Sequence, residues 1–505
     1  MILQLSQPTM KNISLSEEQN AAVTADGQRV VIVASPGSGK SRCLVERAKR
    51  CANPGNVCVL SFTNSAADEL RERLAADGCD PHRFRWLGTL HSFALTEMSR
   101  FGALPAILGD AEKDEAIDAV MKRLGAMARN MSKKEAWGYA MDPPPFGAGA
   151  SVGKAIRAFF RSNGSTHIDF VLGDFLARCG EVAVPDELMI DETQDSGELD
   201  FAIYNAFAAR GSRLWLVADP RQSIYGFRGA RPDIMLAETR KPETQVFQLR
   251  TNYRSYPEIC YAGTCLGRAM IGMEHLDAEI IPDDKEGCGD VVFEKFDSCE
   301  EEILCIAENW FNGTIEQGEK PPSFAVLCRF NDQVRSTAAI LRAKGITLAA
   351  STDRELGTET VAWVPKLAAE ADVWEVERMI DNDWNQVMTR LGVPFDDQKK
   401  LLPRLMRCHC AADVAGLADD EADVPECQCW VGTVHSVKGR EFDHVWITGC
   451  DSATYHSGDQ ETLRLLFVGA TRPRYSLTLS WARSRIQPGS MKRITVEPTE
   501  FLKLI

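Results

Sequence analysis

The chain has 505 residues and a mass of 55.9 kDa, enough for about three to four domains of ~150 residues each. Hydrophobic residues make up 44% of the sequence and charged residues 26%, which is ordinary for a globular protein and excludes wholesale disorder. The formal net charge is −15, so charge alone does not indicate a nucleic-acid partner, although a basic channel between domains stays compatible with it.

The sequence also argues against membrane and secretory classes. No apolar stretch approaches the ~18 residues that span a bilayer. Residues 1–19 lack a basic start, a long apolar centre and a small-residue cleavage site, so we expect no signal peptide. The 16 cysteines are too sparse for a disulfide scaffold and are typical of reduced thiols in the cytosol. We therefore expect a soluble, cytoplasmic protein.

Apolar β-branched runs alternate with helical stretches in chain order. Early strands are predicted at 30–34, 57–62, 188–190 and 214–218, with helices at 40–50 and 65–74. Later strands are predicted at 290–296, 323–328, 430–434, 444–448 and 477–481. Such alternation predicts parallel sheets with helices on both faces, and hence two α/β domains.

Two segments differ from this pattern. Residues 111–136 are charged, rich in Ala and Met and spaced as a helix, whereas the Pro- and Gly-rich run 142–150 cannot be one. Three tryptophans and an acidic run mark the second segment, at Trp363, Trp374, Trp384 and 419–423. We expect a mostly helical insertion at 95–170, which divides the first domain into 1–94 and 171–250. A reduced insertion at 353–425 is expected to divide the second domain into 251–352 and 426–505.

The strongest local signal is a glycine-rich loop between a predicted strand and a predicted helix. Backbone N–H groups at 37–40 can form a concave anion site, and the helix N-terminus adds positive potential. Lys40 is placed to reach the β- and γ-phosphates of a nucleotide, and the Ser41 hydroxyl to ligate Mg²⁺. The strict pattern has glycine where Ala34 stands, so this is a variant match. The expected nucleotide-binding residues are Ala34, Ser35, Pro36, Gly37, Ser38, Gly39, Lys40, Ser41 and Arg42.

An acidic pair follows the predicted strand at 188–190. Asp191 is placed to hold Mg²⁺, and Glu192 to polarise the water that attacks the γ-phosphate. Acidic pairs at strand ends often serve solvation alone, but coupling to the loop at Lys40 favours the catalytic interpretation. The sequence therefore predicts an ATP and Mg²⁺ site with Ser41 and Asp191 as the metal ligands.

Further motifs occur in a fixed order along the chain. They are 15–22 (LSEEQNAA), 61–67 (SFTNSAA), 88–92 (GTLHS), 191–195 (DETQD), 218–230 (ADPRQSIYGFRGA), 251–255 (TNYRS), 431–442 (VGTVHSVKGREF) and 466–472 (LFVGATR). Each is weak alone, but the ordered set resembles that of superfamily 1 DNA helicases of the UvrD/Rep/PcrA type. The resemblance covers about residues 15 to 475. It implies two RecA-like P-loop domains with parallel sheets, each carrying a mostly helical insertion.

The resemblance also implies roles around the nucleotide. Gln19 would read the adenine edge, Tyr253 would stack on the adenine, and Glu441 would contact the sugar. Gln222 would sense the γ-phosphate. Phosphoryl transfer spreads negative charge over the γ-phosphoryl oxygens, so cations from the second domain are needed there. The implied catalytic residues are Lys40, Asp191, Glu192, Gln222, Arg254 and Arg472.

A second group of residues is implied to bind single-stranded DNA. A motor must grip any base sequence, so aromatic faces and backbone contacts are expected. Core packing is the alternative for Phe62 and Tyr225, and a structural hydrogen bond the alternative for His91. The implied DNA-binding residues are Phe62, Thr63, Asn64, His91, Tyr225 and Phe227 in the first domain and Thr433 and His435 in the second.

Some features depart from the family pattern. Arg221 replaces an acidic or small polar residue, and Pro473 and Arg474 change the end of the last motif. The segment between Arg254 and Thr433 is short for the family's second insertion. We therefore expect weak or partner-dependent unwinding, with translocation retained.

The resemblance predicts an ATP-dependent DNA helicase or single-strand translocase that moves 3′ to 5′. Its expected partners are single-stranded and tailed double-stranded DNA and a loading or accessory protein, with no membrane. Two alternatives stay open: a DNA-dependent ATPase that displaces proteins with little strand separation, and an NTPase that acts on RNA. Zinc ligands could come from Cys408, Cys410, Cys427 and Cys429, but buried thiols without metal are the commoner outcome.

Overall fold

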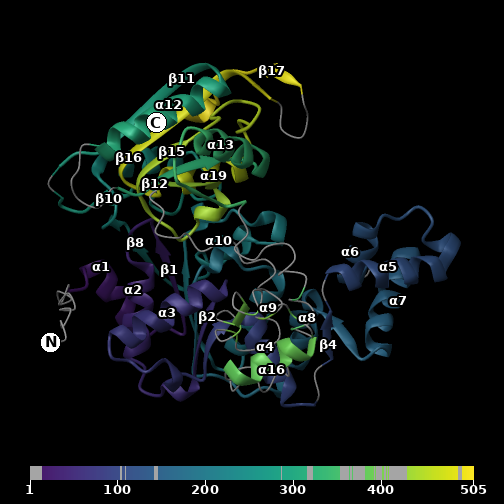
Figure 1. The fold of residues 1–505 in the computed structure, drawn as a ribbon. Coiled ribbons are helices and arrows are strands. Elements are labelled where there is room, and N and C mark those ends of the chain that lie inside the picture. The colour runs from purple at the N-terminus through teal and green to yellow at the C-terminus, as the bar shows by residue number, and fades with distance from the viewer. Residues whose placement is uncertain are drawn as a thin grey trace, which may run out of the picture.

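The computed structural model describes residues 14–102, 105–108, 110–141, 146–285, 287–315, 322–352, 381–391, 429–486 and 492–505, together with isolated positions between 363 and 414. This part of the chain forms two large sheets surrounded by helices, with a group of helices projecting to one side (Figure 1). Neighbouring strands run parallel in both sheets, apart from one antiparallel strand at the C-terminal end. The predicted α/β fold with parallel sheets is confirmed.

The first sheet has six strands in the order β3-β2-β6-β7-β1-β8. They are β1 (Arg29–Ala34), β2 (Val57–Ser61), β3 (Trp86–Thr89), β6 (Glu187–Ile190), β7 (Arg213–Ala218) and β8 (Gln245–Leu249). Strands β2, β6 and most of β1 and β7 are buried, because their apolar residues pack on both faces. Their carboxyl ends therefore lie at one edge of the sheet, which brings the loops that follow them together.

Helices cover both faces of this sheet. They are α1 (Glu17–Thr24), α2 (Lys40–Lys49), α3 (Asn64–Ala76), α4 (Leu90–Ser99), α8 (Ile168–Arg178), α9 (Glu198–Ala208) and α10 (Pro232–Glu238). Alternate residues of a strand enter different cores, as the pleat requires: Val31 and Val33 pack in one cluster, and Val30 and Ile32 in another. The second cluster lies under α1, α2 and α3, and contains Leu44 of α2.

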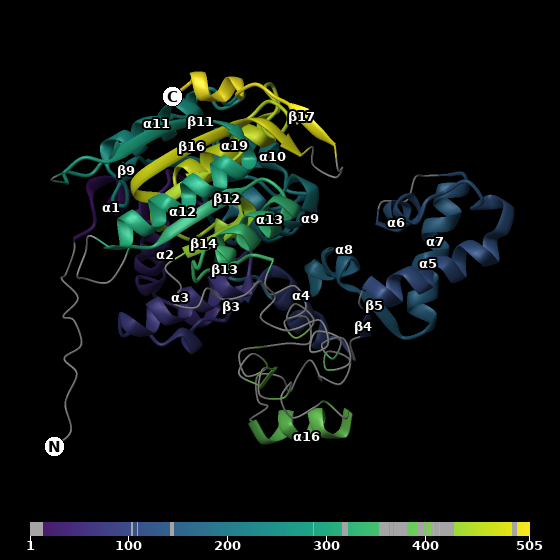
Figure 2. The same cartoon turned by 45° about the horizontal axis from the view of Figure 1, so that its top comes forward.

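A group of helices lies between the paired strands β4 (Ala106–Leu108) and β5 (Ser165–His167). It contains α5 (Asp110–Leu124), α6 (Lys133–Met141) and α7 (Ala148–Ser162), which have a core of their own that includes Ile117, Val152 and Phe160. These helices stand apart from the sheets (Figure 2). Residues 95–99, which the sequence places in the insertion, complete helix α4, and Leu95 packs in a core of the first sheet.

The second sheet has the order β11-β16-β15-β12-β14-β13, and β17 adds antiparallel to β16. Its strands are β11 (Asp290–Ser298), β12 (Phe324–Cys328), β13 (Ala349–Ala350), β14 (Cys429–Thr433), β15 (Phe442–Ile447), β16 (Pro473–Ile486) and β17 (Arg493–Thr495). The helices beside it are α11 (Pro257–Arg268), α12 (Cys299–Ile315), α13 (Asn331–Ala343) and α19 (Gln460–Ala470). Between the sheets, β9 (Thr251–Asn252) pairs with β10 (Ile281–Pro282).

The predicted insertion at 353–425 lies largely outside the described residues. Within it the structure describes α16 (Asp381–Leu391) and a small buried cluster that includes Trp384, Leu405 and Cys408. Trp374 and the acidic run 419–423 are among the positions that the structure does not describe.

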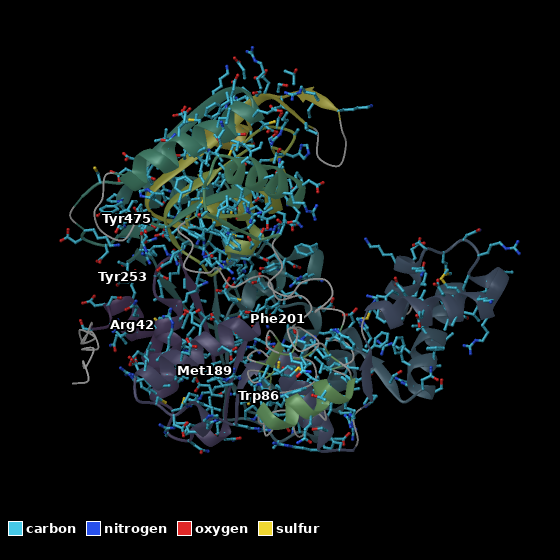
Figure 3. All side chains as sticks on the ribbon, in the orientation of Figure 1. Arg42, Trp86, Met189, Phe201, Tyr253 and Tyr475 are labelled. Carbon is cyan, nitrogen blue, oxygen red and sulfur yellow. The ribbon has the colours of Figure 1, made fainter. Side chains whose placement is uncertain are left out.

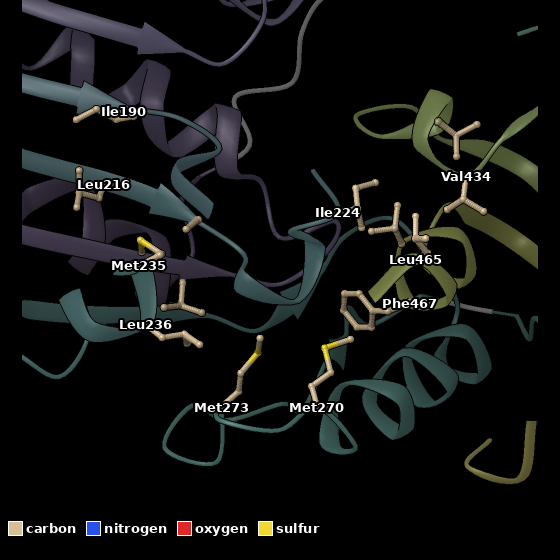
Figure 4. Packing of buried hydrophobic residues seen from close by; sticks show 14 of the residues in the cluster. Ile190, Leu216, Ile224, Met235, Leu236, Met270, Met273, Val434, Leu465 and Phe467 are labelled. Carbon is tan, nitrogen blue, oxygen red and sulfur yellow. The ribbon is translucent and has the colours of Figure 1, made fainter. Parts of the chain in front are cut away.

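One apolar cluster connects the two sheets. It runs from Ile190 and Leu216 in the first sheet to Leu465 and Phe467 in α19 (Figure 4). Three methionines, Met235, Met270 and Met273, belong to the same cluster. Methionine side chains adapt to changing packing, so this contact suits a junction whose two sides move. None of the described helices is long and apolar enough to cross a membrane.

Candidate functional site

The glycine-rich loop joins β1 to α2. Gly37 and Gly39 adopt φ angles of 70° and 83°, a region that favours glycine. A Cβ atom at Gly37 would lie 2.8 Å from Asn252 Oδ1, and one at Gly39 would lie 2.8 Å from Gln19 Nε2. Helix α2 begins at Lys40, so its N-terminus faces the loop. The loop thus has the shape of an anion cradle.

Neighbouring segments hold this loop in place through its carbonyl groups. Gln19 Nε2 donates to Ser38 O at 2.9 Å, and Asn252 Nδ2 donates to Pro36 O at 2.8 Å. The Tyr253 N–H donates to Gly37 O at 2.9 Å. Bound in this way, the loop carbonyls point away from the cradle. The Ser38 N–H donates to Ser35 O at 3.2 Å, so binding of a ligand falls to the other N–H groups of the loop.

The lysine of the loop is paired with a carboxylate. Lys40 Nζ lies 2.8 Å from Glu192 Oε1, and Gln194 Nε2 also donates to Glu192. Glu192 is the one non-glycine residue with positive φ in the described part of the chain, at 50°. Such a conformation costs about 1 kcal/mol or more and is kept where the surroundings impose it, commonly at a functional site.

The charges of this group shift one another. Burial alone would lower the pKa of Lys40, but Glu192 and Asp191 outweigh it and raise that pKa. Burial together with the charge of Glu192 raises the pKa of Asp191 to about 6. Burial opposes ionisation of Glu192, yet Lys40 and Lys438 hold the pKa of its carboxyl well below its usual range. Glu192 is therefore ionised, and its pairing with Lys40 and Lys438 makes it a weak proton acceptor in this arrangement.

Two arginines enter the site from the second sheet. Arg472 is 2% exposed, and its Nη2 donates to Gln222 Oε1 at 2.6 Å. Gln222 in turn donates from Nε2 to Asp219 Oδ2 at 2.8 Å. Arg254 Nε lies 2.7 Å from Glu441 Oε2. The structure thus brings the predicted γ-phosphate residues Gln222, Arg254 and Arg472 to the site of Lys40.

These groups line one cavity of about 780 Å³. Residues 35–42, Asp191, Glu192 and Gln222 line it from the first sheet, and Arg254, Glu441, Arg472, Arg474 and Tyr475 from the side of the second. Figure 3 shows Arg42, Tyr253 and Tyr475 along the same side of the molecule, at the junction of the two sheets. Gln19 and Ala34, which the sequence placed at the nucleotide, do not line this cavity. Gln19 instead donates a hydrogen bond to Ser38 O of the loop, and Ala34 is the last residue of β1.

A cluster of aromatic side chains lies where the two sheets meet on another surface. The rings of Phe62 and Tyr225 are stacked with centroids 5.6 Å apart. Phe227 is 68% exposed and contacts both Tyr225 and His435, with centroids 6.0 Å and 5.6 Å apart. Arg228 lies over the rings of Tyr225 and Phe227. An exposed aromatic group edged by cations is a platform on which bases can stack.

The other predicted DNA-binding residues hold local structure. Thr63 caps α3 by accepting from the Ala66 N–H at 3.2 Å, and Asn64 is exposed at the start of that helix. Burial lowers the pKa of His91 in α4 to about 4. Thr433 ends β14, and its Oγ1 accepts from the Ser436 N–H at 3.4 Å. Their part in DNA binding stays a prediction.

Comparison with known families agrees with this site. Residues 15–136 and 184–243 match the UvrD/REP helicase N-terminal domain, and residues 428–480 match the UvrD-like helicase C-terminal domain. These matches support a helicase of the UvrD/Rep/PcrA type. Members of this ATP-hydrolysing family that resemble it include the ATP-dependent DNA helicase UvrD2 of Mycobacterium tuberculosis, 25% identical over 97% of this chain and 81% of that protein. The ATP-dependent DNA helicase PcrA of Leuconostoc citreum is 29% identical over 52% of this chain and 40% of that protein.

The site contains a residue that the sequence did not single out. Lys438 Nζ contacts Asp195, lies 3.7 Å from Glu192 Oε2, and donates to Gln222 O at 3.1 Å. The same Nζ lies 5.1 Å from the centroid of the Tyr225 ring. Lys438 therefore joins the carboxylates to the aromatic cluster. Lys438 could have been singled out from its place inside the motif at 431–442, which also contributes Glu441 and His435.

The cysteines considered as alternative zinc ligands are only partly described. Cys408 and Cys429 are buried, whereas Cys410 and Cys427 lie outside the described residues. Among the described residues no group of three or more His, Cys, Asp or Glu side chains is placed to hold a metal ion. Zinc binding by these cysteines stays the less favoured alternative to buried thiols without metal.

Proposed function

We propose that the two sheets form two RecA-like domains that hydrolyse ATP between them and use the cycle to move along single-stranded DNA, 3′ to 5′, as a helicase. The observation that carries this proposal is the shared cavity. One side supplies the anion cradle and the carboxylates, and the other supplies the guanidinium groups of Arg254 and Arg472. The names of the relatives, ATP-dependent DNA helicases, support the same reaction and substrate.

Binding of ATP requires an exchange of partners at Lys40. Its ammonium now pairs with Glu192 Oε1 at 2.8 Å. The β- and γ-phosphates in the cradle would take this ammonium, which frees Glu192 to face the attacking water. Lys438 and Gln194 remain to hold the Glu192 carboxylate in place.

Hydrolysis then needs a proton acceptor and groups that stabilise the developing charge. Lys40 is a cause of the lowered pKa of Glu192, so that pKa rises when Lys40 turns to the phosphates. Glu192 is then suited to take the proton of the water as the water oxygen attacks phosphorus. Negative charge builds on the γ-phosphoryl and bridging oxygens as the bond to ADP breaks. Lys40, Arg254 and Arg472 can neutralise it from two sides.

The residues fit a divalent cation beside the phosphates. Asp191 is half-buried directly after β6, and desolvation together with the charge of Glu192 raises its pKa, so a cation beside it would stabilise its charged form. Ser41 lines the same cavity from the first turn of α2. Asp191 and Ser41 would hold Mg²⁺, which when bound neutralises charge on the phosphate oxygens and helps to orient them.

The structure suggests how hydrolysis reaches the DNA. Gln222 contacts Arg472 across the cavity, and Tyr225 and Phe227 of the aromatic cluster follow it within five residues. Closing or opening of the cavity would therefore shift the cluster against His435 of the second sheet. Bases stacked on the cluster would move with it.

The test is ATP hydrolysis with single-stranded DNA and RNA, followed by strand separation with 3′-tailed and 5′-tailed duplexes. We expect stimulation by DNA above that by RNA, and separation of the 3′-tailed duplex in preference. Stimulation by RNA alone, or preference for the 5′-tailed duplex, would contradict the proposal. Hydrolysis stimulated by DNA with no movement in a translocation assay would favour a protein-displacing ATPase instead.

A further inference from the structure

Glu441 is held by two arginines at once. Arg254 Nε lies 2.7 Å from Glu441 Oε2, and Arg474 Nη2 lies 2.5 Å from Glu441 Oε1. All three residues line the cavity. Burial would raise the pKa of Glu441, but Arg474 and Arg254 lower it to about 2. The carboxylate is therefore charged and has both oxygens engaged.

Hydrogen bonds join the segments that carry the two arginines. Ser255 Oγ donates to Pro473 O at 2.7 Å, and the Tyr256 N–H donates to the carbonyl of Arg474 at 3.2 Å. Arg254 Nη1 also donates to Thr471 O at 3.1 Å, a bond that the Arg254 side chain would give up on turning to a nucleotide. The first two bonds do not involve the side chains of Arg254 and Arg474, so the segments can stay joined while these side chains change partners.

The two arginines are not equivalent toward the ligand. The Arg254 side chain is 15% exposed, whereas that of Arg474 is 41% exposed. Arg474 also has a second carboxylate, with Nη1 3.3 Å from Asp443 Oδ1, on the strand that begins beside Glu441. Arg474 is therefore anchored between two acidic residues of its own domain, whereas Glu441 is the one carboxylate paired with Arg254 among the described residues.

We propose that Arg474 is a positioning residue for ATP: it holds Glu441 when Arg254 leaves that carboxylate for the γ-phosphate. The inference rests on the proposed function, in which Arg254 turns to the phosphates. In the absence of Arg474, the departure of Arg254 would leave an unpaired carboxylate beside a triphosphate. The repulsion between these like charges would oppose ATP binding, and the remaining Arg254–Glu441 pair would be harder to separate.

Binding of ADP should not require Arg254 to leave Glu441, because ADP lacks the γ-phosphate. With ADP bound, Arg254 can stay paired with Glu441, so Arg474 is not needed as its only cation. The role of Arg474 is therefore expected to depend on the phosphate that distinguishes the two nucleotides. A residue that merely supported the fold, or contacted the sugar or base, would affect both nucleotides alike.

The experiment measures binding of ADP and of a non-hydrolysable imido analogue of ATP by calorimetry, with Mg²⁺, to the full chain. We expect Arg474→Ala to weaken the ATP analogue by about tenfold and ADP by less than about twofold. Arg474→Lys keeps a cation near Glu441 and should restore part of the loss. Arg335→Ala is the matched control, because Arg335 is 66% exposed in α13 and pairs with Asp332 away from the cavity.

A double variant tests whether Arg474 acts through the carboxylate of Glu441. Glu441→Gln removes the charge that Arg474 compensates, so adding Arg474→Ala to it should cause no further selective loss of the ATP analogue. Equal losses for ADP and the analogue, or the same selective loss in the Glu441→Gln background, would overturn the inference. Absence of ATP hydrolysis in the unmodified chain would instead contradict the proposed function, so the two failures are distinguishable.

Discussion

Arg472 Nη2 donates to Gln222 Oε1 at 2.6 Å, and this hydrogen bond joins the second sheet to the end of a strand of the first. Burial, with the charge of Arg254, lowers the pKa of Arg472 to about 9, so the guanidinium is still charged at neutral pH. No described carboxylate lies within ion-pair distance of it. A buried cation with a neutral partner is available for a phosphate.

Arg472→Ala is expected to lower kcat for ATP hydrolysis by about 10²–10³-fold with a smaller change in KM, because the guanidinium stabilises charge that develops in the transition state. The folded state should survive, since removing a buried cation that has no carboxylate partner relieves its desolvation, which offsets the loss of its hydrogen bonds to Gln222 and to Val468 O. Steady-state kinetics and thermal unfolding check both points. A kcat within about twofold of the unmodified chain would show that Arg472 does not face the reacting phosphate.

Glu192→Gln is expected to bind ATP but to hydrolyse it about 10²–10⁴-fold more slowly, because the proton acceptor is lost. Affinity for ATP should be kept or increased, since Lys40 loses the carboxylate with which the phosphates compete. Binding and single-turnover measurements separate the two effects. Glu198→Gln serves as the control, because the Glu198 side chain is 79% exposed at the start of α9. Turnover unchanged by Glu192→Gln would exclude it as the base.

Phe227→Ala is expected to weaken binding of single-stranded DNA by about 1–3 kcal/mol, the usual worth of one stacked base. Phe227 is 68% exposed and adds little to the core, so stability should be unaffected. Fluorescence anisotropy with a labelled oligonucleotide gives the affinity. Phe146→Ala is the matched control, because Phe146 is 82% exposed and lies outside the aromatic cluster. Equal DNA affinities for the two variants would show that the aromatic cluster does not bind the DNA.

Lys438→Gln is expected to lower the stimulation of ATP hydrolysis by DNA by about tenfold, because Lys438 contacts both Glu192 and the Tyr225 ring. The measurement is the ratio of hydrolysis rates with and without single-stranded DNA. Lys295→Gln is a suitable control, since Lys295 lies 5.3 Å over the ring of Trp481 in the second sheet, away from the cavity lining. An unchanged ratio for Lys438→Gln would deny it a coupling role.

The buried strands of the fold could be predicted from the sequence because their apolar runs are continuous. The runs at 30–34 and 214–218 correspond to β1 and β7, and the helix predicted at 40–50 to α2. Strands β3 and β8 do not stand out in the sequence: both are edge strands whose residues are partly exposed, whereas the four-residue strand β6 is buried throughout. Half-exposed strands carry too little apolar pattern to be recognised.

The residues of the site could be predicted, but their pairings could not. Motif order located Lys40, Glu192, Arg254 and Arg472, because the chemistry fixes residue types within each motif. It did not predict that Asn252 holds the loop at Pro36 O. Contacts between side chains far apart in sequence depend on the packing of the two sheets, which no local pattern encodes.

The most direct test of the account is the rate of ATP hydrolysis with and without single-stranded DNA for the unmodified chain and for Lys40→Ala. We predict hydrolysis that DNA stimulates in the unmodified chain, and loss of this activity in Lys40→Ala with an unchanged unfolding temperature. Undiminished turnover by a folded Lys40→Ala variant, or no hydrolysis by the unmodified chain, would contradict the claim that the cavity between the two sheets is an ATP-driven motor site.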